Sequence, residues 1–454
     1  MISVLSSCAT VPRDAGFQEV QSTVSERIGQ RVQWRTGSPE DQEVAAKVSE
    51  LLQQELDAER AVQIALLNNS RLQATYEELA ISQADLVQAG LLRNPVFDAA
   101  ILFPEGDERP ELDFGISQDF LSIFYLPLNK RLAENQFEAA KLRVTGEVLG
   151  LAREVRSAFY RAQAANQMLD LFDEVVRNTS ASYVAAQELY EAGNITDLAL
   201  AQERSIYEES RLALAQAEAD FLFARERLNR LMGVWGEQTQ WKINARLPAL
   251  PDNALDLDNL EARAIEASFD LAAQRNALVA SATRLGLIGV IPDLEIGVRA
   301  EREEDWEFGP SIGLEIPIFD FGQARRAQAR AELRRAQAQY AASAVELRAA
   351  VRAAYATLVS TRDRAIFVRD VFLPLRNQVV NQTLLQYNAM QVGVFQLLIA
   401  QREQIAAARE YIETLRDYWL ATSTLQQIMS GGMVQMDTSG RSMINRPASG
   451  DMGQ

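Results

Sequence analysis

The chain has 454 residues, of which 24% are charged and 48% hydrophobic, and its formal net charge is −17. This acidic balance argues against nucleic acid as a partner, because nucleic-acid-binding proteins present a basic surface. The chain contains no histidine and one cysteine, which excludes Ser-His-Asp and Cys-His catalysis and argues against zinc or copper sites. We therefore expect no enzymatic activity, no cofactor and no metal centre.

The N-terminal segment carries the only cysteine. Cys8 follows Ser6 and Ser7, and this arrangement is typical of the site cleaved by a bacterial lipoprotein signal peptidase. Residues 1–8 are too short for a signal peptide, whose apolar core alone needs about 7–15 residues. We expect the start codon to lie further upstream, or the leader to have been shortened. We interpret Cys8 as a lipidation site, with an incidental cysteine as the alternative, and residues 9–56 as an extended N-terminal lead.

Much of the remaining chain repeats itself at an offset of about 196 residues. The sequence Tyr190-Glu191-Ala192-Gly193, for example, corresponds to Tyr387-Asn388-Ala389-Met390. We predict two structural repeats, 57–240 and 241–432, each with a helix, two strands, a long helix, a turn and a second helix. Residues 433–454 are rich in Gly, Ser, Met and Pro and are predicted to be disordered.

Four short runs between the predicted helices alternate between apolar and polar residues, as strands do. Their length of about 9–11 residues is that of a tilted membrane strand. A small antiparallel sheet packed on helices in a soluble protein is the alternative. In lipid a sheet has no open edge, and single-chain barrels begin at eight strands, so four strands imply oligomerisation. The residues predicted to face lipid are Phe97, Ile101, Leu112, Phe114, Ile116, Leu294, Ile296, Val298, Ile312 and Leu314.

The predicted long helices carry apolar residues at alternating steps of four and three, from Val144 to Tyr190 and from Leu347 to Val379. This is the period of a left-handed coiled coil. A helix over 130–192 would be about 95 Å long, whereas a compact globule of this chain length is about 60 Å across. The helix must therefore project and pack against other long helices. Pro374 is predicted to bend or break the second long helix.

The turns between the long helices are predicted hairpin tips. Gly193 suits the left-handed conformation that ends a helix, and either Thr196 or Asn194 can cap the helix that follows. Gly393 is predicted to play a part similar to that of Gly193 in the second repeat.

The duplicated unit, the run Ala-Gly-Leu-Leu-Arg-Asn-Pro at 89–95 and the segment Leu189–Leu198 resemble TolC-type outer-membrane efflux proteins. The resemblance covers residues 58–432. It implies a mainly α fold with a small β part: a long coiled-coil α-helical barrel plus four membrane β-strands per chain, completing a 12-stranded barrel in a homotrimer. It also implies a lipid-anchored protein of the Gram-negative outer membrane that extends into the periplasm and docks by its tips onto a periplasmic adaptor protein and an inner-membrane transporter.

The resemblance further implies a periplasmic gate at the tips. Carboxylates that follow the second tip in the family correspond here to Gln396 and Ile399, so no acidic ring is expected at that place. Asp197 matches the family's acid after the first tip, and a favourable interaction with the helix dipole is its alternative role. The predicted tip and gate residues are Gly193, Asn194, Thr196, Asp197, Gln391, Gly393 and Gln396.

These patterns predict a channel that conducts solutes passively, and the resemblance implies that it is the outer-membrane part of a tripartite efflux or secretion system. The alternative is a periplasmic adaptor or a coiled-coil tether without a pore. An adaptor would need lipoyl-like and β-barrel modules flanking one hairpin, whereas this sequence predicts two hairpins and four strands.

Overall fold

The computed structural model describes residues 11–12, 14–102, 111–119, 122–251, 259–287, 294–302, 306–314 and 321–432. Cys8 and the tail at 433–454 lie outside these residues. The chain divides into two compact units, and each takes segments from both predicted repeats. The boundary between the repeats therefore stays a prediction. The first unit comprises Met1–Val20, Thr75–Val144 and Phe269–Val345, and the second comprises Gln21–Ala74, Thr145–Ser268 and Glu346–Gln454.

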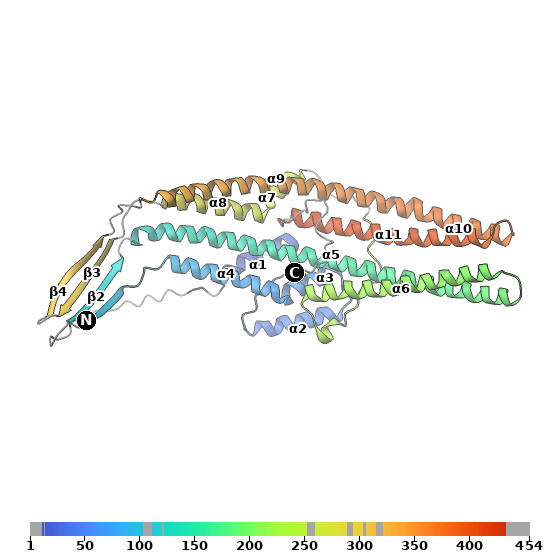
Figure 1. Cartoon of the computed structure of the whole chain (residues 1–454), viewed down its shortest axis with the longest axis horizontal. Helices are drawn as coiled ribbons and strands as arrows, with labels where there is room; N and C mark the ends of the chain where they lie inside the picture. The colour runs from blue at the N-terminus through green and yellow to red at the C-terminus, as the bar shows by residue number, and fades with distance from the viewer. Residues whose placement is uncertain are drawn as a thin grey trace. The chain divides into compact units, whose positions relative to one another are not determined.

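The order of the elements confirms the predicted duplication (Figure 1). The first series is α3 (Ala58–Asn68), α4 (Ser70–Ala89), β1 (Val96–Leu102), β2 (Glu111–Asp119), α5 (Ser122–Glu191) and α6 (Asp197–Met232), followed by the short 3-10 helix η1 (Gly236–Thr239). The second series is α7 (Leu260–Ala267), α8 (Phe269–Leu287), β3 (Leu294–Arg302), β4 (Trp306–Leu314), α9 (Gln323–Phe367), the π-helix η2 (Val368–Phe372), α10 (Leu373–Asn388) and α11 (Val394–Met429).

The interpretation of residues 9–56 as an extended lead is wrong for two stretches. This segment contains helix α1 (Phe17–Ile28) and helix α2 (Glu40–Gln53). Val20 and Val24 of α1 are buried, and so is Val48 of α2. A spacing of four residues places two side chains on the same face of a helix. The two helices bury only these few apolar side chains. Because most of their residues are polar, the sequence showed no clear helical periodicity of apolar residues.

The long helix α5 has 70 residues and is therefore about 105 Å long. It begins at Ser122, earlier than the predicted start near residue 130, and it contains Pro127 in its second turn. Because proline has no N–H group, Pro127 removes one backbone hydrogen bond, the one that would reach the carbonyl group four residues earlier. Val144, Val148 and Val155 of the predicted coiled-coil seam are fully buried.

The predicted interruption at Pro374 takes the form of a π-helical turn. The π-helix η2 directly precedes α10, and Pro374 lies in the first turn of α10. A proline inside a continuous α-helix clashes with the carbonyl group four residues earlier. The wider π turn relieves this clash, so the chain continues as α10.

The first unit contains a four-stranded sheet in the order β1-β2-β3-β4, and all neighbouring strands are antiparallel. Among the described residues, β1 and β4 form its two edges (Figure 1). In one row across the sheet Ala99 pairs with Phe114, Phe114 with Ala300, and Ala300 with Phe308. Directly paired residues project to the same face, so this register fixes which side chains share a face.

In the second unit the C-terminus of α6 packs on the junction between α3 and α4. The side-chain amide of Asn69 donates to the carbonyl oxygen of Leu231 at 2.8 Å, and that of Asn68 donates to the carbonyl oxygen of Gly233 at 2.7 Å. Gly233 ends α6 in the left-handed conformation, with φ of 69°. A Cβ atom at Gly233 would lie 2.8 Å from the carbonyl oxygen of Asn68. Only glycine fits this close approach between two segments of backbone.

We expect Gly233→Ala to lower the free energy of unfolding by about 3 kcal/mol, because left-handed strain and a backbone clash add together. The measurement is the urea midpoint of the helical circular dichroism signal. Gly236→Ala is the matched control, since Gly236 has φ of 60° but no atom within 4 Å of the added Cβ. The control loses about 1 kcal/mol from backbone strain alone. Equal losses in the two variants would refute the packing account of Gly233.

Candidate functional site

The predicted lipid-facing residues lie on one face of the sheet. Phe97 pairs with Ile116, which pairs with Val298 on the next strand. Ile296 pairs with Ile312, which extends this face to the edge strand β4. The side chains of Phe97, Ile101, Ile116, Val298 and Ile312 are exposed in the single chain. The same register places Leu112, Phe114, Leu294 and Leu314 on this face.

Aromatic side chains gather on this same face. Phe114 stacks against Phe97 on one side and Trp306 on the other, with ring centroids 6.2 Å and 6.0 Å away. Trp306 in turn stacks on Phe308, with centroids 6.0 Å apart, and Phe308 is 73% exposed. Such a large exposed apolar surface needs a partner that is not water.

The opposite face of the sheet carries a row of carboxylates. Asp113 pairs with Glu301, and Glu301 pairs with Glu307, so three acidic residues lie side by side on neighbouring strands. The Nε atom of Arg299 lies 3.6 Å from a carboxylate oxygen of Asp113. Like charges directly opposite one another destabilise a sheet. The row therefore costs stability, which is typical of residues retained for function.

The first hairpin tip joins α5 to α6 (Figure 1). Gly193 adopts the left-handed conformation, as predicted, with φ of 74°. Its N–H donates to the carbonyl oxygen of Tyr190, and the N–H of Asn194 donates to that of Leu189, both at 2.8 Å. This is the Schellman arrangement that satisfies the last carbonyl groups of a helix. Thr196, not Asn194, caps α6, because its hydroxyl accepts from the N–H of Ala199 at 3.3 Å.

The second tip, between α10 and α11, repeats this geometry with a different residue. Met390 takes the left-handed conformation, with φ of 56°, and Gly393 instead precedes α11 with φ of −81°. The prediction that Gly393 plays the part of Gly193 is therefore wrong. The N–H of Gln391 donates to the carbonyl oxygen of Gln386 at 2.9 Å, as in the first tip. A non-glycine residue in this conformation is strained.

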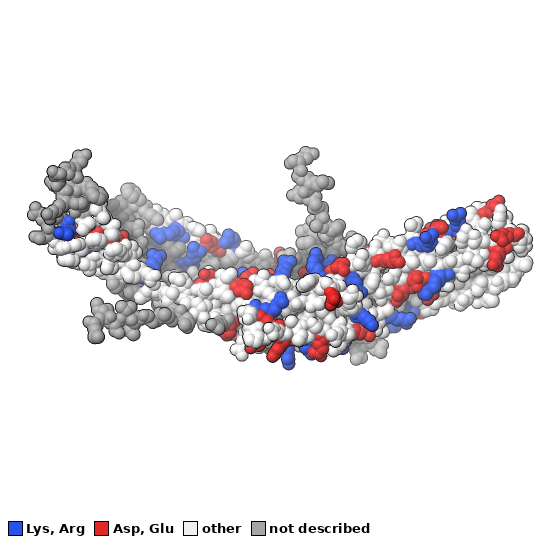
Figure 2. Space-filling model, turned by 90° about the horizontal axis from the view of Figure 1, so that it is seen from below, with Lys and Arg blue, Asp and Glu red and all other residues white. Residues whose placement is uncertain are grey.

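The Asp197 carboxylate acts on Tyr190 across the first tip. Hydrogen bonding to this carboxylate and its negative charge raise the pKa of the Tyr190 hydroxyl. The structure therefore gives Asp197 a partner across the turn. At this tip Figure 2 shows acidic side chains and no basic ones. Glu188, Glu191 and Asp197 lie in this part of the sequence.

The two hairpins are tied together in the second unit by charged side chains. Arg402 of α11 forms an ion pair with Glu209 of α6 at 2.7 Å. Within the second hairpin, Arg376 of α10 pairs with Glu403 of α11. The predicted gate residues Gln391 and Gln396 are both exposed at the tip.

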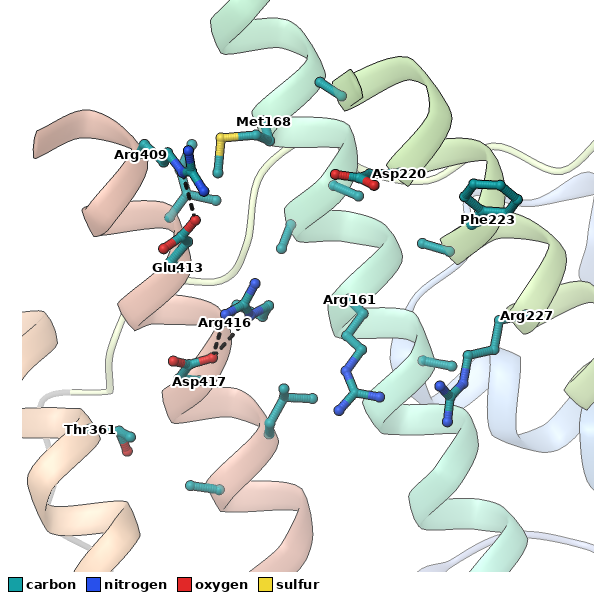
Figure 3. A pocket seen from close by; sticks show the side chains of 18 of the residues that line it. Arg161, Met168, Asp220, Phe223, Arg227, Thr361, Arg409, Glu413, Arg416 and Asp417 are labelled. Carbon is teal, nitrogen blue, oxygen red and sulfur yellow. Dashed lines mark hydrogen bonds and ion pairs between the residues drawn. The ribbon is translucent and has the colours of Figure 1, made fainter. Parts of the chain in front are cut away.

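The second unit contains a cavity that sequence reasoning missed. It has a volume of about 1090 Å³ and is lined by α5, α6, α9 and α11 of the second unit (Figure 3). Its charged residues come from segments far apart in the sequence, and no local motif marks them. In the sequence, the only hint of the cavity was the spacing of arginines along the helices. Arginines spaced in this way usually lie on a helix face that is exposed to solvent.

The described residues contain neither a metal-binding cluster nor a helix that could cross a membrane. No group of three or more Cys, Asp or Glu side chains there is arranged to hold a metal ion. In the same part of the chain, every helix is too short or too polar to cross a membrane.

Comparison with known proteins finds similarity to outer-membrane efflux proteins. Residues 111–234 match the family described as outer membrane efflux protein. The chain is 24% identical over 387 residues to the cobalt-zinc-cadmium resistance protein CzcC of Cupriavidus metallidurans, covering 82% of this chain and 90% of that protein. It is 25% identical over 356 residues to the probable outer membrane lipoprotein SilC of Salmonella typhimurium, covering 72% of each.

Solved structures share the fold. A crystal structure of CusC, from work on its folding and transmembrane channel formation, superimposes with a TM-score of 0.69 at 19% identity. The superposition covers 83% of this chain and 93% of CusC. The Campylobacter jejuni CmeC outer membrane channel gives a TM-score of 0.70 at 15% identity, covering 83% of this chain and 86% of that one.

Proposed function

We propose that this chain, a member of the outer membrane efflux protein family, works as a homotrimeric exit channel and conducts solutes passively from the periplasm to the exterior. The observation that carries this proposal is the sheet, with one exposed apolar face, one acidic face and two open edges. In lipid, open edges leave backbone groups without hydrogen bonds, so the sheet requires neighbours on both sides. The family is one of transport channels, and catalysis forms no part of the proposal.

The strand directions are compatible with closure by copies of the same chain. Four antiparallel strands bring β4 of one copy antiparallel to β1 of the next, and three copies form a closed barrel of twelve strands. The apolar face, with Phe97, Ile116 and Ile312, then faces lipid. The acidic face lines the pore and favours cations, in agreement with the relatives' names, which refer to cation efflux and to cobalt, zinc and cadmium.

The helical hairpins form the periplasmic tunnel and dock by their tips onto a periplasmic adaptor coupled to an inner-membrane transporter. Met390 supports this assignment, since its side chain is 93% exposed on a strained backbone at the tip. Strain and apolar exposure at one residue are typical of a contact site. Cys8 is proposed to carry the lipid anchor, which mass spectrometry of the N-terminal peptide tests.

The proposal is tested by recording single-channel currents of the purified protein in planar bilayers and measuring the mass of the detergent-solubilised particle. A trimer with discrete, cation-preferring conductance is expected. A water-soluble monomer that produces no current would contradict the proposal. The chain would then be assigned as an adaptor or a coiled-coil tether.

A hydrogen bond from the Tyr190 hydroxyl to the Asp197 carboxylate is proposed to hold the tip closed. We expect Tyr190→Phe to raise the open probability in planar bilayers, because it removes the donor and keeps the ring. The raised pKa of Tyr190 means that the bond is fully present below the ordinary tyrosine pKa and is lost as the pH rises through the higher folded value. In the wild type the open probability should therefore rise above about pH 10, whereas the variant should show no such rise. Identical pH profiles would rule out this role.

A further inference from the structure

The cavity among the four helices of the second unit contains arginines without carboxylate partners. Arg161 projects from α5 and Arg227 from the adjacent α6, and Figure 3 shows the two side chains running in the same direction. Neither guanidinium has an ion-pair or hydrogen-bond partner among the described residues. In a chain with a net charge of −17, carboxylates are abundant, so this lack of partners is unexpected.

The carboxylates that line the cavity are already engaged elsewhere. Glu413 pairs with Arg409 at 2.8 Å, and Asp417 pairs with Arg416, also at 2.8 Å (Figure 3). Asp220 accepts a hydrogen bond from the side chain of Gln216 at 2.9 Å. The lining therefore has a local excess of positive charge at Arg161 and Arg227.

The arginines also repel one another. Burial, together with the charges of Arg227, Arg416 and Arg153, lowers the pKa of Arg161 to about 10, while the charge of Asp417 opposes this shift. Burial likewise lowers the pKa of Arg153, whose Nε atom is buried without a hydrogen-bond partner. Arg161 and Arg153 are half-buried, whereas Arg227 is exposed. A half-buried charge beside like charges costs stability unless a counter-ion offsets it.

The geometry points to a binding site for a multivalent oxyanion at Arg161 and Arg227, which line the same cavity. Guanidinium groups present parallel N–H donors that match phosphate and carboxylate oxygens. A cavity of about 1090 Å³ accommodates a pyrophosphate or a small organic polycarboxylate. The inference rests on the proposed function, because it treats this cavity as part of the channel wall. In that wall, the positive charge of Arg161 and Arg227 would repel cations unless an anion neutralised it. A bound oxyanion cancels that charge and lets cations pass.

The test is isothermal titration of inorganic pyrophosphate into the purified full-length protein in detergent at low salt. We expect the variant Arg161→Gln/Arg227→Gln to bind pyrophosphate at least about tenfold more weakly than the wild type. Arg177→Gln/Arg211→Gln is the matched control. It removes the same charge from exposed arginines of α5 and α6 that pair with Glu174 at 2.6 Å and Glu208 at 3.0 Å. The control should bind as the wild type does.

A charge-preserving variant separates the site from effects on folding. Arg161→Lys/Arg227→Lys should retain part of the affinity, because it keeps both charges and loses the paired donors. In planar bilayers, pyrophosphate should raise the cation preference of the wild type and leave that of the glutamine variant unchanged.

Three possible results of these experiments bear on the oxyanion site. Absent or equal binding in wild type, glutamine variant and control would overturn the inference. Absent binding combined with loss of the trimer in the glutamine variant would also overturn it, because carboxylates of a neighbouring copy would then cover the arginines. Binding that depends on Arg161 and Arg227 in a protein that forms no pores would support the site and contradict the proposed channel.

Discussion

Replacing Trp241 with alanine is expected to lower the free energy of unfolding by about 4 kcal/mol. The indole of Trp241 is 2% exposed, and its Nε1–H donates to the side-chain oxygen of Asn229 at 2.7 Å. The guanidinium of Arg225 lies over the ring, 4.3 Å from its centroid. The substitution therefore creates a large cavity, leaves the oxygen of Asn229 without its donor and removes a cation–π contact.

Trp235 provides a matched control for this prediction, because its side chain is 80% exposed. Trp235→Ala should change the unfolding free energy by about 0.5 kcal/mol or less. Both values come from the urea midpoint of the helical circular dichroism signal at equal protein concentration. Similar small losses in the two variants would show that Trp241 does not anchor the end of α6.

Neutralising the carboxylate row of the sheet should abolish most of the cation preference that we propose for the channel. The variant Asp113→Asn/Glu301→Gln/Glu307→Gln removes three adjacent charges from the face assigned to the pore. Rings of acidic side chains raise the local cation concentration in a pore, because low-dielectric walls focus their field. We expect the cation-to-anion permeability ratio to fall several-fold toward one. The reversal potential under a tenfold gradient of potassium chloride measures it.

Two controls make this result specific. Glu40→Gln/Asp41→Asn/Glu43→Gln removes the same number of carboxylates from the first turn of α2 and should leave the ratio unchanged. Arg299→Gln removes the cation beside Asp113 and should raise the ratio. An unchanged reversal potential in the sheet variant would place the selective part of the pore elsewhere. Because like charges across a sheet repel, the sheet variant should be no less stable than the wild type.

The faces of the sheet could be read from the sequence, because a strand alternates its side chains with a period of two. The ten predicted lipid-facing residues fall on one face, and Asp113, Glu301 and Glu307 fall on the other. What the alternation could not give was the register between strands. Only the pairing of β2 with β3 and of β3 with β4 aligns the three carboxylates into a row.

Other features could not be predicted because they depend on tertiary contacts or on unusual local conformations. Arg161 and Arg227 lie on different helices, and only the packing of α5 against α6 brings them into one cavity. Glycine preference pointed to Gly393, yet Met390 adopts the left-handed conformation. The internal repeat could have predicted the conformation of Met390, since it aligns Met390 with Gly193. Helices α1 and α2 were missed because each buries few apolar side chains.

Closure of the barrel between copies is tested most directly by disulfide formation between β1 and β4. In one chain these strands are the two edges of the sheet, about 14 Å apart, which is too far for a disulfide. Ala99→Cys is combined in turn with Phe308→Cys, Pro310→Cys and Ile312→Cys, which lie on the same face. The pair Ala99→Cys/Phe114→Cys on neighbouring strands is the positive control.

The account predicts that at least one β1–β4 combination gives a covalent trimer on denaturing gels after oxidation in outer-membrane vesicles. Ala99→Cys/Gly309→Cys should give none, because Gly309 lies on the opposite face. Monomeric chains in every β1–β4 combination, with a disulfide formed in the positive control, would contradict closure of the sheet by neighbouring copies.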